Sequence, residues 1–170
     1  MIAEWQRFAR FFPELAPELD PDESTLRARF HELLAQRRDA FEEYAYELRV
    51  RTTSDFLGHA SVHALMWKHG CAEIGYWVRT QAEGQGFVAE AVGVLERTLF
   101  EHGFQRAEIR CDAENHLSAA VARRCGYVLD GTLRAHMRRL DGSYRSSFVF
   151  GKLREDAAPS TRVLASPARK

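Results

Sequence analysis

The sequence predicts an α/β (α+β) fold in which helices flank one mixed β-sheet. Alternating apolar segments come first, then a strand–helix–strand–helix order, and last two strands joined by the turn Asp141-Gly142. Because crossover helices join parallel strands and tight turns join antiparallel ones, we expect both pairings in one sheet. The 170 residues suit one domain, which we place at 1–154, and the stretch 155–170, rich in Ala, Pro and Ser, is predicted to be a flexible tail.

The first elements are expected to be helices and then antiparallel strands. Residues 1–12 are amphipathic, and a second helix carries Leu26, Phe30, Leu33 and Leu34 at helical spacing. Strands are predicted over 40–50, 56–65 and 72–79. Gly75 interrupts the third of these strands, where we expect a bulge or a close backbone approach.

The second half is predicted to alternate between helices and strands. After a turn, residues 87–102 form a strong amphipathic helix, which Gly103 ends. A helix over 115–125 follows the next strand and ends at Gly126. The remaining strands are expected over 105–111, 127–139 and 144–153.

The composition is that of an ordinary globular protein. The formal net charge is zero, which does not favour binding to bulk nucleic acid or to an anionic membrane. No apolar run is long enough to span a bilayer and the N-terminus lacks a signal-type core, so we expect a cytoplasmic protein. Three scattered cysteines and the spacing of His59, His63 and His69 indicate neither a disulfide framework nor a metal site.

The turn before the helix at 87–102 is suited to a pyrophosphate. Residues 81–86 read Q-A-E-G-Q-G. The first turn of a helix has unpaired N–H groups and about half a positive charge, and glycines at 84 and 86 leave room for close approach. The spacing fits neither a dinucleotide fingerprint nor a P-loop. On these six residues alone, a plain strand–helix turn is an equally good interpretation.

A longer stretch resembles the GNAT N-acetyltransferase superfamily. Gln81, Gly84 and Gly86 stand at the positions of its Q/R-x-x-G-x-G/A motif. The segments E-I-G-Y-W, G-Q-G-F-V-A-E-A, E-I-R-C-D-A-E-N-H-L-S and C-G-Y, in this order, resemble the RimJ/RimL-like branch that acetylates ribosomal proteins. The resemblance covers about residues 73–153, and the part before residue 41 matches weakly.

The resemblance implies a fold and a cosubstrate, acetyl-CoA. In that fold the fourth and fifth strands of a twisted mixed sheet splay apart, and the pantetheine arm pairs with strand backbone in the gap. A bulge at Gly75 would open this gap. The family's first strand has no counterpart in this sequence. The cofactor-binding residues that we expect are Tyr76, Trp77, Val78, Gln81, Gly84, Gln85, Gly86, Phe87, Asn115 and Arg124, with an oxyanion donor among the N–H groups of residues 76–78.

The thiolate leaving group needs a hydrogen-bond donor. Many family members use a tyrosine seven residues after the asparagine that Asn115 matches, but this position is Ala122 here. The RimJ/RimL-like branch places its donor three residues after the asparagine, which predicts Ser118. Asn115 also suits a helix N-cap, and Ser118 is tolerated in a first turn, so capping alone is the competing interpretation.

The base that accepts the amine's proton is less well defined by the sequence. Glu73 is the leading candidate, although a solvated strand-end glutamate is an equally good interpretation. Some relatives of the family carry a carboxylate at the position that Met137 occupies in this chain. His136 is adjacent, with an imidazole suited to proton transfer, and we expect it to face away from Met137. Tyr144 is a candidate for the wall of the amine pocket, while the hairpin arginines, such as Arg139, are expected to be solvated.

The predicted reaction is direct acetyl transfer from acetyl-CoA to a primary amine. A protein N-terminus and a small amine such as a polyamine both remain candidates for the acceptor, with no metal required. A non-catalytic CoA-binding module is the alternative, and an adaptor without a cofactor is a third. The cluster of Phe8, Phe11 and Phe12 suits either the core or a homodimer contact.

Overall fold

The computed structural model describes residues 43–157 of the chain. The two helices predicted before residue 40 and the phenylalanine cluster lie outside the described residues. All the remaining predicted strands and helices are present, with boundaries shifted by one to three residues.

The described strands form one six-stranded sheet in the order β1-β2-β3-β4-β6-β5. Its strands are β1 (Glu43–Arg49), β2 (Phe56–Met66), β3 (Cys71–Val78), β4 (Arg106–Asp112), β5 (Val128–Arg138) and β6 (Tyr144–Leu153). Only β3 and β4 pair in parallel; the other neighbours are antiparallel. The mixed sheet predicted from the order of the elements is therefore confirmed.

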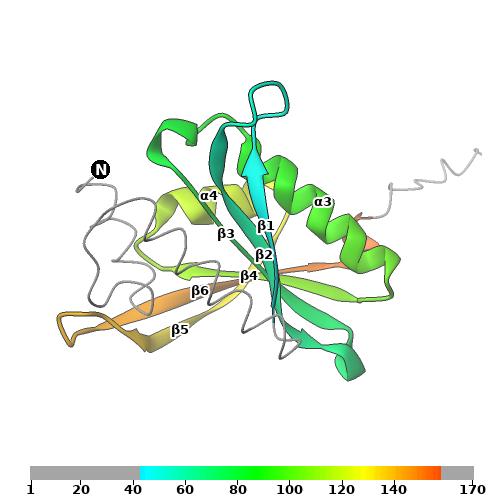
Figure 1. Ribbon diagram of the computed structural model, residues 1–170. Helices are drawn as coiled ribbons and strands as arrows, with labels where there is room; N and C mark the ends of the chain where they lie inside the picture. The colour runs from blue at the N-terminus through cyan, green and yellow to red at the C-terminus, as the bar shows by residue number, and fades with distance from the viewer. Residues whose placement is uncertain (1–42, 158–170) are drawn as a thin grey trace, which may run out of the picture.

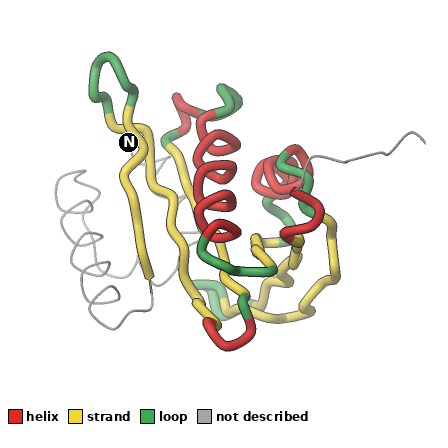
Figure 2. Tube along the Cα trace, turned by 90° about the vertical axis from the view of Figure 1, so that its right-hand side faces the viewer, coloured by secondary structure: helices red, strands yellow, loops and turns green. Residues whose placement is uncertain are grey.

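Two helices cover one face of this sheet. They are α3 (Phe87–Glu101), which connects β3 to β4, and α4 (His116–Arg124), which connects β4 to β5. Figures 1 and 2 show α3 lying along the sheet. Both helices contribute to one apolar core with the strands, whose fully buried members include Ile74, Val92, Ile109, Ala119 and Phe150. The opposite face of the sheet is polar where Glu73 of β3 meets the charged residues Arg106, Glu108 and Arg110 of β4.

The helix ends follow from local chemistry. Gly103 adopts φ +91° directly after α3, and Gly126 adopts φ +83° after α4, as the sequence predicts for glycines that end helices. Residues 154–157 form a short helix, α5 (Arg154–Ala157), which includes the first three residues of the expected tail at 155–170. Asp156 accepts a hydrogen bond from the Leu153 N–H (2.9 Å), which ties this turn to β6.

The sheet splits between β3 and β4. Their parallel pairing covers only Cys71–Glu73 and stops there, so the β4-facing edge of β3 has no strand partner beyond Glu73. In Figure 1, β1 to β3 run up the view while β4 to β6 run across it. The splay that the resemblance implies is therefore present, between the third and fourth described strands.

The expected bulge at Gly75 is absent. Gly75 pairs with Ser61 in an unbroken register, and the irregularity of this strand pair lies between His63 and Met66. The other expectation, close approach, is correct, because a Cβ on Gly75 would lie 2.8 Å from His63 Cε1 and 3.2 Å from Ser61 Oγ. The gap in the sheet thus opens because the pairing with β4 ends, and Gly75 makes room for side chains of β2.

A bulge does occur in β5. The register with β6 shifts between Leu133 and Met137, and Ala135 within the bulge adopts φ +49°. The His136 side chain consequently reaches Ser147 (Nδ1 to Oγ, 3.1 Å), on the same face as Arg145, the cross-strand partner of Met137. The expectation that His136 faces away from Met137 is therefore wrong, because the extra residues break the strand alternation.

Candidate active site

The glycine turn forms an open cradle at the start of α3. Gly84 and Gly86 adopt φ +71° and +89°, and a Cβ built on either would meet no atom within 4 Å. The turn is closed from within, because the Gln85 side-chain amide donates to the Gln81 carbonyl oxygen (2.6 Å). Gln85 thus has a structural contact here, and its predicted contact with the cofactor stays a prediction, as do those of Gln81 and Phe87.

The N-terminus of α3 has donors without helical partners. Gly86 is the N-cap, no side chain caps this end, and the first helical hydrogen bond runs from the Glu90 N–H to the Gly86 carbonyl (3.0 Å). The N–H groups of residues 87–89 therefore have no helical acceptor and point out of the helix end. Since β3 ends just before this turn, the cradle adjoins the unpaired edge of residues 76–78. The residues fit a pyrophosphate on the turn and an extended arm along β3.

The predicted donor Ser118 belongs to a hydroxyl pair that bridges the splay. Its Oγ donates to the Tyr76 hydroxyl on β3 (3.1 Å), and this phenol donates to the Ser118 carbonyl oxygen (3.1 Å). Burial raises the pKa of the Tyr76 phenol, which therefore stays protonated as a neutral donor. Burial also raises the pKa of the neighbouring Cys111 thiol, although a hydrogen bond with Ser118 opposes this shift. Three groups with S–H or O–H bonds thus gather where the sheet opens.

The sequence reasoning placed Tyr76 only as a backbone contact and missed its hydroxyl. Helix α4 has no tyrosine, because Ala122 stands where many family members have one. Tyr76 of β3 supplies a phenol hydroxyl at this site instead. Strand alternation could have located it, since Tyr76 shares the helix-covered face with Ile74. The contact with Ser118, 42 residues away, depends on how α4 packs on the sheet.

Asn115 is confirmed as the N-cap of α4. Its Oδ1 accepts the Ser118 N–H at 3.1 Å, which both starts the helix and places Ser118 in the first turn. The capping role is thus present, and the predicted contact of Asn115 with the cofactor stays a prediction. Arg124, in the last turn of α4, takes part in no ion pair among residues 43–157.

Removal of the cap should destabilise the protein modestly. We expect Asn115→Ala to lower the free energy of unfolding by about 1 kcal/mol, the usual worth of an N-cap side chain. Asn115→Asp, which keeps the acceptor oxygen, should stay close to the wild type. Urea unfolding of the ligand-free protein measures both. An alanine variant as stable as the wild type would contradict a capping role.

Glu73 is held between His63 and Arg110 on the polar face of the sheet. Its Oε1 lies 3.4 Å from His63 Nε2, and its Oε2 lies 3.3 Å from Arg110 Nε. Glu73 is therefore not the solvated strand-end residue of the alternative interpretation. With both oxygens engaged, its carboxylate is better placed to orient a neighbour than to accept a proton directly.

The remaining candidates lie on β3 and on the β5–β6 hairpin. Tyr144, at the start of β6, is exposed, and its proposed role in the amine pocket stays a prediction. Trp77 stacks against His59 on the polar face, with ring centroids 5.3 Å apart. Arg139, expected to be solvated, instead lies 3.2 Å from the buried carboxylate of Asp112. This contact ties the hairpin to β4 across the sheet.

Residues 43–157 contain neither a membrane-spanning helix nor a cluster of metal ligands. No helix there is long and apolar enough to cross a membrane. In the same part of the chain, no three His, Cys, Asp or Glu side chains gather as metal ligands.

Comparisons with known proteins agree with this geometry. A family model described as an acetyltransferase (GNAT) domain matches residues 1–128. A ribosomal-protein-serine acetyltransferase of Escherichia coli (strain K12) is 30% identical over 92 residues, which are 54% of this chain and 51% of that protein. The chain thus matches about half the length of this curated relative.

Solved structures share the fold. A GNAT-family protein of Chromobacterium violaceum, described as a probable acetyltransferase, is 28% identical, with a TM-score of 0.72 over 91% of this chain and 78% of that one. The microcin C7 self-immunity acetyltransferase in complex with acetyl-CoA and AMP has a TM-score of 0.74 at 22% identity, over 89% of this chain and 82% of that one. The second likeness extends to the fold alone.

Proposed function

Since the chain belongs to the GNAT acetyltransferase domain family, we propose that it transfers the acetyl group of acetyl-CoA to the α-amine of a protein N-terminus. The family that the motifs of residues 73–153 indicated is thus the family to which the chain belongs. The acceptor is proposed from the E. coli relative, whose described substrate is a ribosomal protein. A cytoplasmic location and a homodimer stay predictions from the sequence.

The open N-terminus of α3 beside the unpaired edge of β3 is the observation that carries the proposal. Backbone N–H groups and two glycines at positive φ suit a pyrophosphate, and the splay leads from this turn to the hydroxyl pair of Tyr76 and Ser118. Acetyl-CoA bound in this way would place its thioester between a phosphate anchor at one end and hydroxyl donors at the other. Ser118 would then donate a hydrogen bond to the sulfur as the C–S bond breaks.

The chemistry also favours an α-amine. Direct transfer needs a neutral amine, and an α-amino group has a pKa of about 8, against about 10.4 for a lysine side chain. At neutral pH about a tenth of an α-amine is already neutral, while less than about a thousandth of a lysine is. A site with one modest base therefore suits an N-terminus better than a lysine or a polyamine.

Mass spectrometry after incubation with acetyl-CoA tests this proposal. The panel contains peptides with the N-termini of ribosomal proteins, the same peptides with a blocked α-amine and an internal lysine, and spermidine. We expect one acetyl group on the free α-amine and none on the blocked peptides. Acetylated spermidine alone would favour the small-amine alternative. Tight binding of acetyl-CoA in calorimetry without any acetylated product would favour a non-catalytic module.

A further inference from the structure

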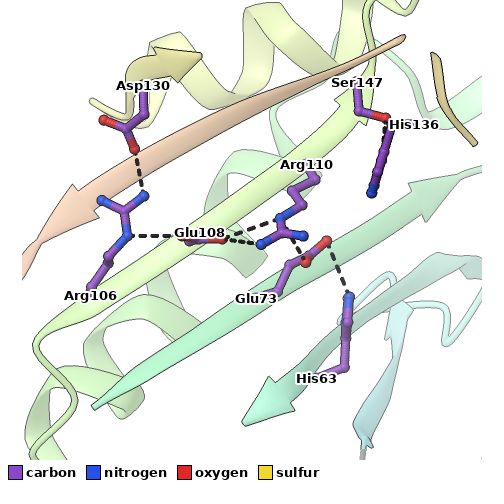
Figure 3. Close-up of polar contacts among 8 residues, drawn as sticks. All are labelled: His63, Glu73, Arg106, Glu108, Arg110, Asp130, His136 and Ser147. Carbon is purple, nitrogen blue, oxygen red and sulfur yellow. Dashed lines mark hydrogen bonds and ion pairs between the residues drawn. The ribbon is translucent and has the colours of Figure 1, made fainter. Parts of the chain in front are cut away.

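His63 lies at the end of a row of charges that crosses the polar face of the sheet. Figure 3 shows carboxylates alternating with basic side chains along this row. In order, the row consists of His63, Glu73, Arg110, Glu108, Arg106 and Asp130. Each carboxylate or guanidinium group in the interior of the row contacts a group of the opposite type on both sides, and His63 is the one imidazole of the row.

The imidazole of His63 is held on three sides. Its Nε2 lies 3.4 Å from Glu73 Oε1, and its Nδ1 lies 3.4 Å from Ser61 Oγ. Its Cε1 rests over Gly75, where a Cβ would come within 2.8 Å. On the other side, Glu43 of β1 is the cross-strand partner of His63 and is buried. The ring is thus fixed beside the point where β3 loses its pairing with β4.

We propose that His63 accepts the proton of the acceptor amine through the hydroxyl of Ser61, with Glu73 as its positioning residue. The inference rests on the proposed function and deepens it. Because Nε2 faces a carboxylate, the neutral ring carries its hydrogen there and leaves Nδ1 as the acceptor. The arrangement follows the order hydroxyl, imidazole, carboxylate, in which the carboxylate orients the ring and stabilises the imidazolium.

The proton transfers balance as follows. The ammonium group gives a proton to Ser61 Oγ while the hydroxyl proton of Ser61 passes to His63 Nδ1. The neutral amine then attacks the thioester carbonyl, forming the C–N bond, and the C–S bond breaks. The second proton of the nitrogen reaches the departing thiolate by way of Ser118, and the imidazolium releases its proton to solvent. The net products are the acetylated amine, the free thiol of CoA and one proton.

This base would select between amines. An imidazole ordinarily titrates about 1.5 units below an α-amine but about four units below a lysine. Proton transfer to an imidazole is therefore only modestly uphill from an N-terminus and steeply uphill from a lysine side chain. Glu73 alone would be a weaker base, and Arg110 already neutralises one of its oxygens.

The test is the pH dependence of kcat/KM for an N-terminal peptide in the wild type and in His63→Gln. For the wild type we expect an ascending limb in the range where imidazoles titrate, about pH 6 to 7. The variant should lose this limb and rise instead with the neutral amine, near pH 8. Because about a tenth of the amine is neutral at pH 7, activity there should fall about tenfold and recover above pH 8.5.

Three further variants separate catalysis from structure. Glu73→Gln removes the carboxylate that favours the imidazolium, so its ascending limb should move to lower pH. His102→Gln, at the far end of α3, is the matched control and should keep the wild-type profile. His136→Gln tests a competing candidate on the same face as His63.

The outcomes distinguish the two proposals. An active wild type whose profile is unchanged in His63→Gln would overturn this inference alone, as would loss of the limb in His136→Gln instead. A wild type that acetylates no amine at any pH would overturn the proposed function and the inference with it.

Discussion

Substitution of Gly86 by valine is expected to raise the dissociation constant of acetyl-CoA tenfold to 10²-fold, about 1.4 to 2.7 kcal/mol of binding free energy. Gly86 is the N-cap of α3, and no atom of residues 43–157 lies within 4 Å of a Cβ built on it. A valine side chain would occupy the position at which a phosphate approaches the unpaired N–H groups. Isothermal titration calorimetry with acetyl-CoA measures the loss.

The effect of backbone strain can be subtracted with a matched control. Gly103, just past the other end of the same helix, has φ +91° against +89° for Gly86, and it too has open space around a built Cβ. Valine at either position carries a similar strain of about 1–3 kcal/mol. Gly103→Val should therefore lose similar stability yet bind acetyl-CoA like the wild type. Equal affinities in the two folded variants would contradict the placement of the pyrophosphate.

Replacement of Ser118 by alanine is expected to lower kcat about 10²-fold, the lower end of what a positioned proton donor contributes. The dissociation constant of acetyl-CoA should change little, because the hydrogen bond to sulfur strengthens only as negative charge develops on it. Pre-steady-state rates of thiol release, with calorimetry for binding, separate the two effects. Ser118→Thr, which keeps a hydroxyl, should retain most of the activity.

The phenol of Tyr76 serves as a second probe of the same site. If the Tyr76 hydroxyl holds Ser118 in place, Tyr76→Phe should lower kcat by less than Ser118→Ala, and the double variant should be no slower than Ser118→Ala alone. Tyr127→Phe is the control, since the Tyr127 hydroxyl is buried and makes no hydrogen bond to Tyr76 or Ser118 among the described residues. Unchanged turnover in Ser118→Ala would leave Ser118 with a structural role only.

Local sequence patterns were sufficient to predict the helices and strands of the described residues and the glycine turn before α3. The periodicity of residues 87–102, the glycines at 84, 86, 103 and 126, and the Asp141-Gly142 turn act over a few residues, so helix ends and hairpins can be predicted from neighbours alone. The same holds for Asn115, whose capping bond reaches only three residues along the chain. The family motifs added the splay between two neighbouring strands of the sheet.

The tertiary structure alone decided which side chains meet across the sheet. The phenol of Tyr76 contacts Ser118 because α4 packs over the splay, and His63 contacts Glu73 because the register of β2 against β3 brings them opposite each other. One extra residue in a strand reverses the face of every later side chain, as the register shift between Leu129 and Gly131 shows, and no local pattern announces it. The turn proposed to anchor the cosubstrate could thus be predicted from sequence, whereas the groups proposed to move protons depend on register and packing between distant segments.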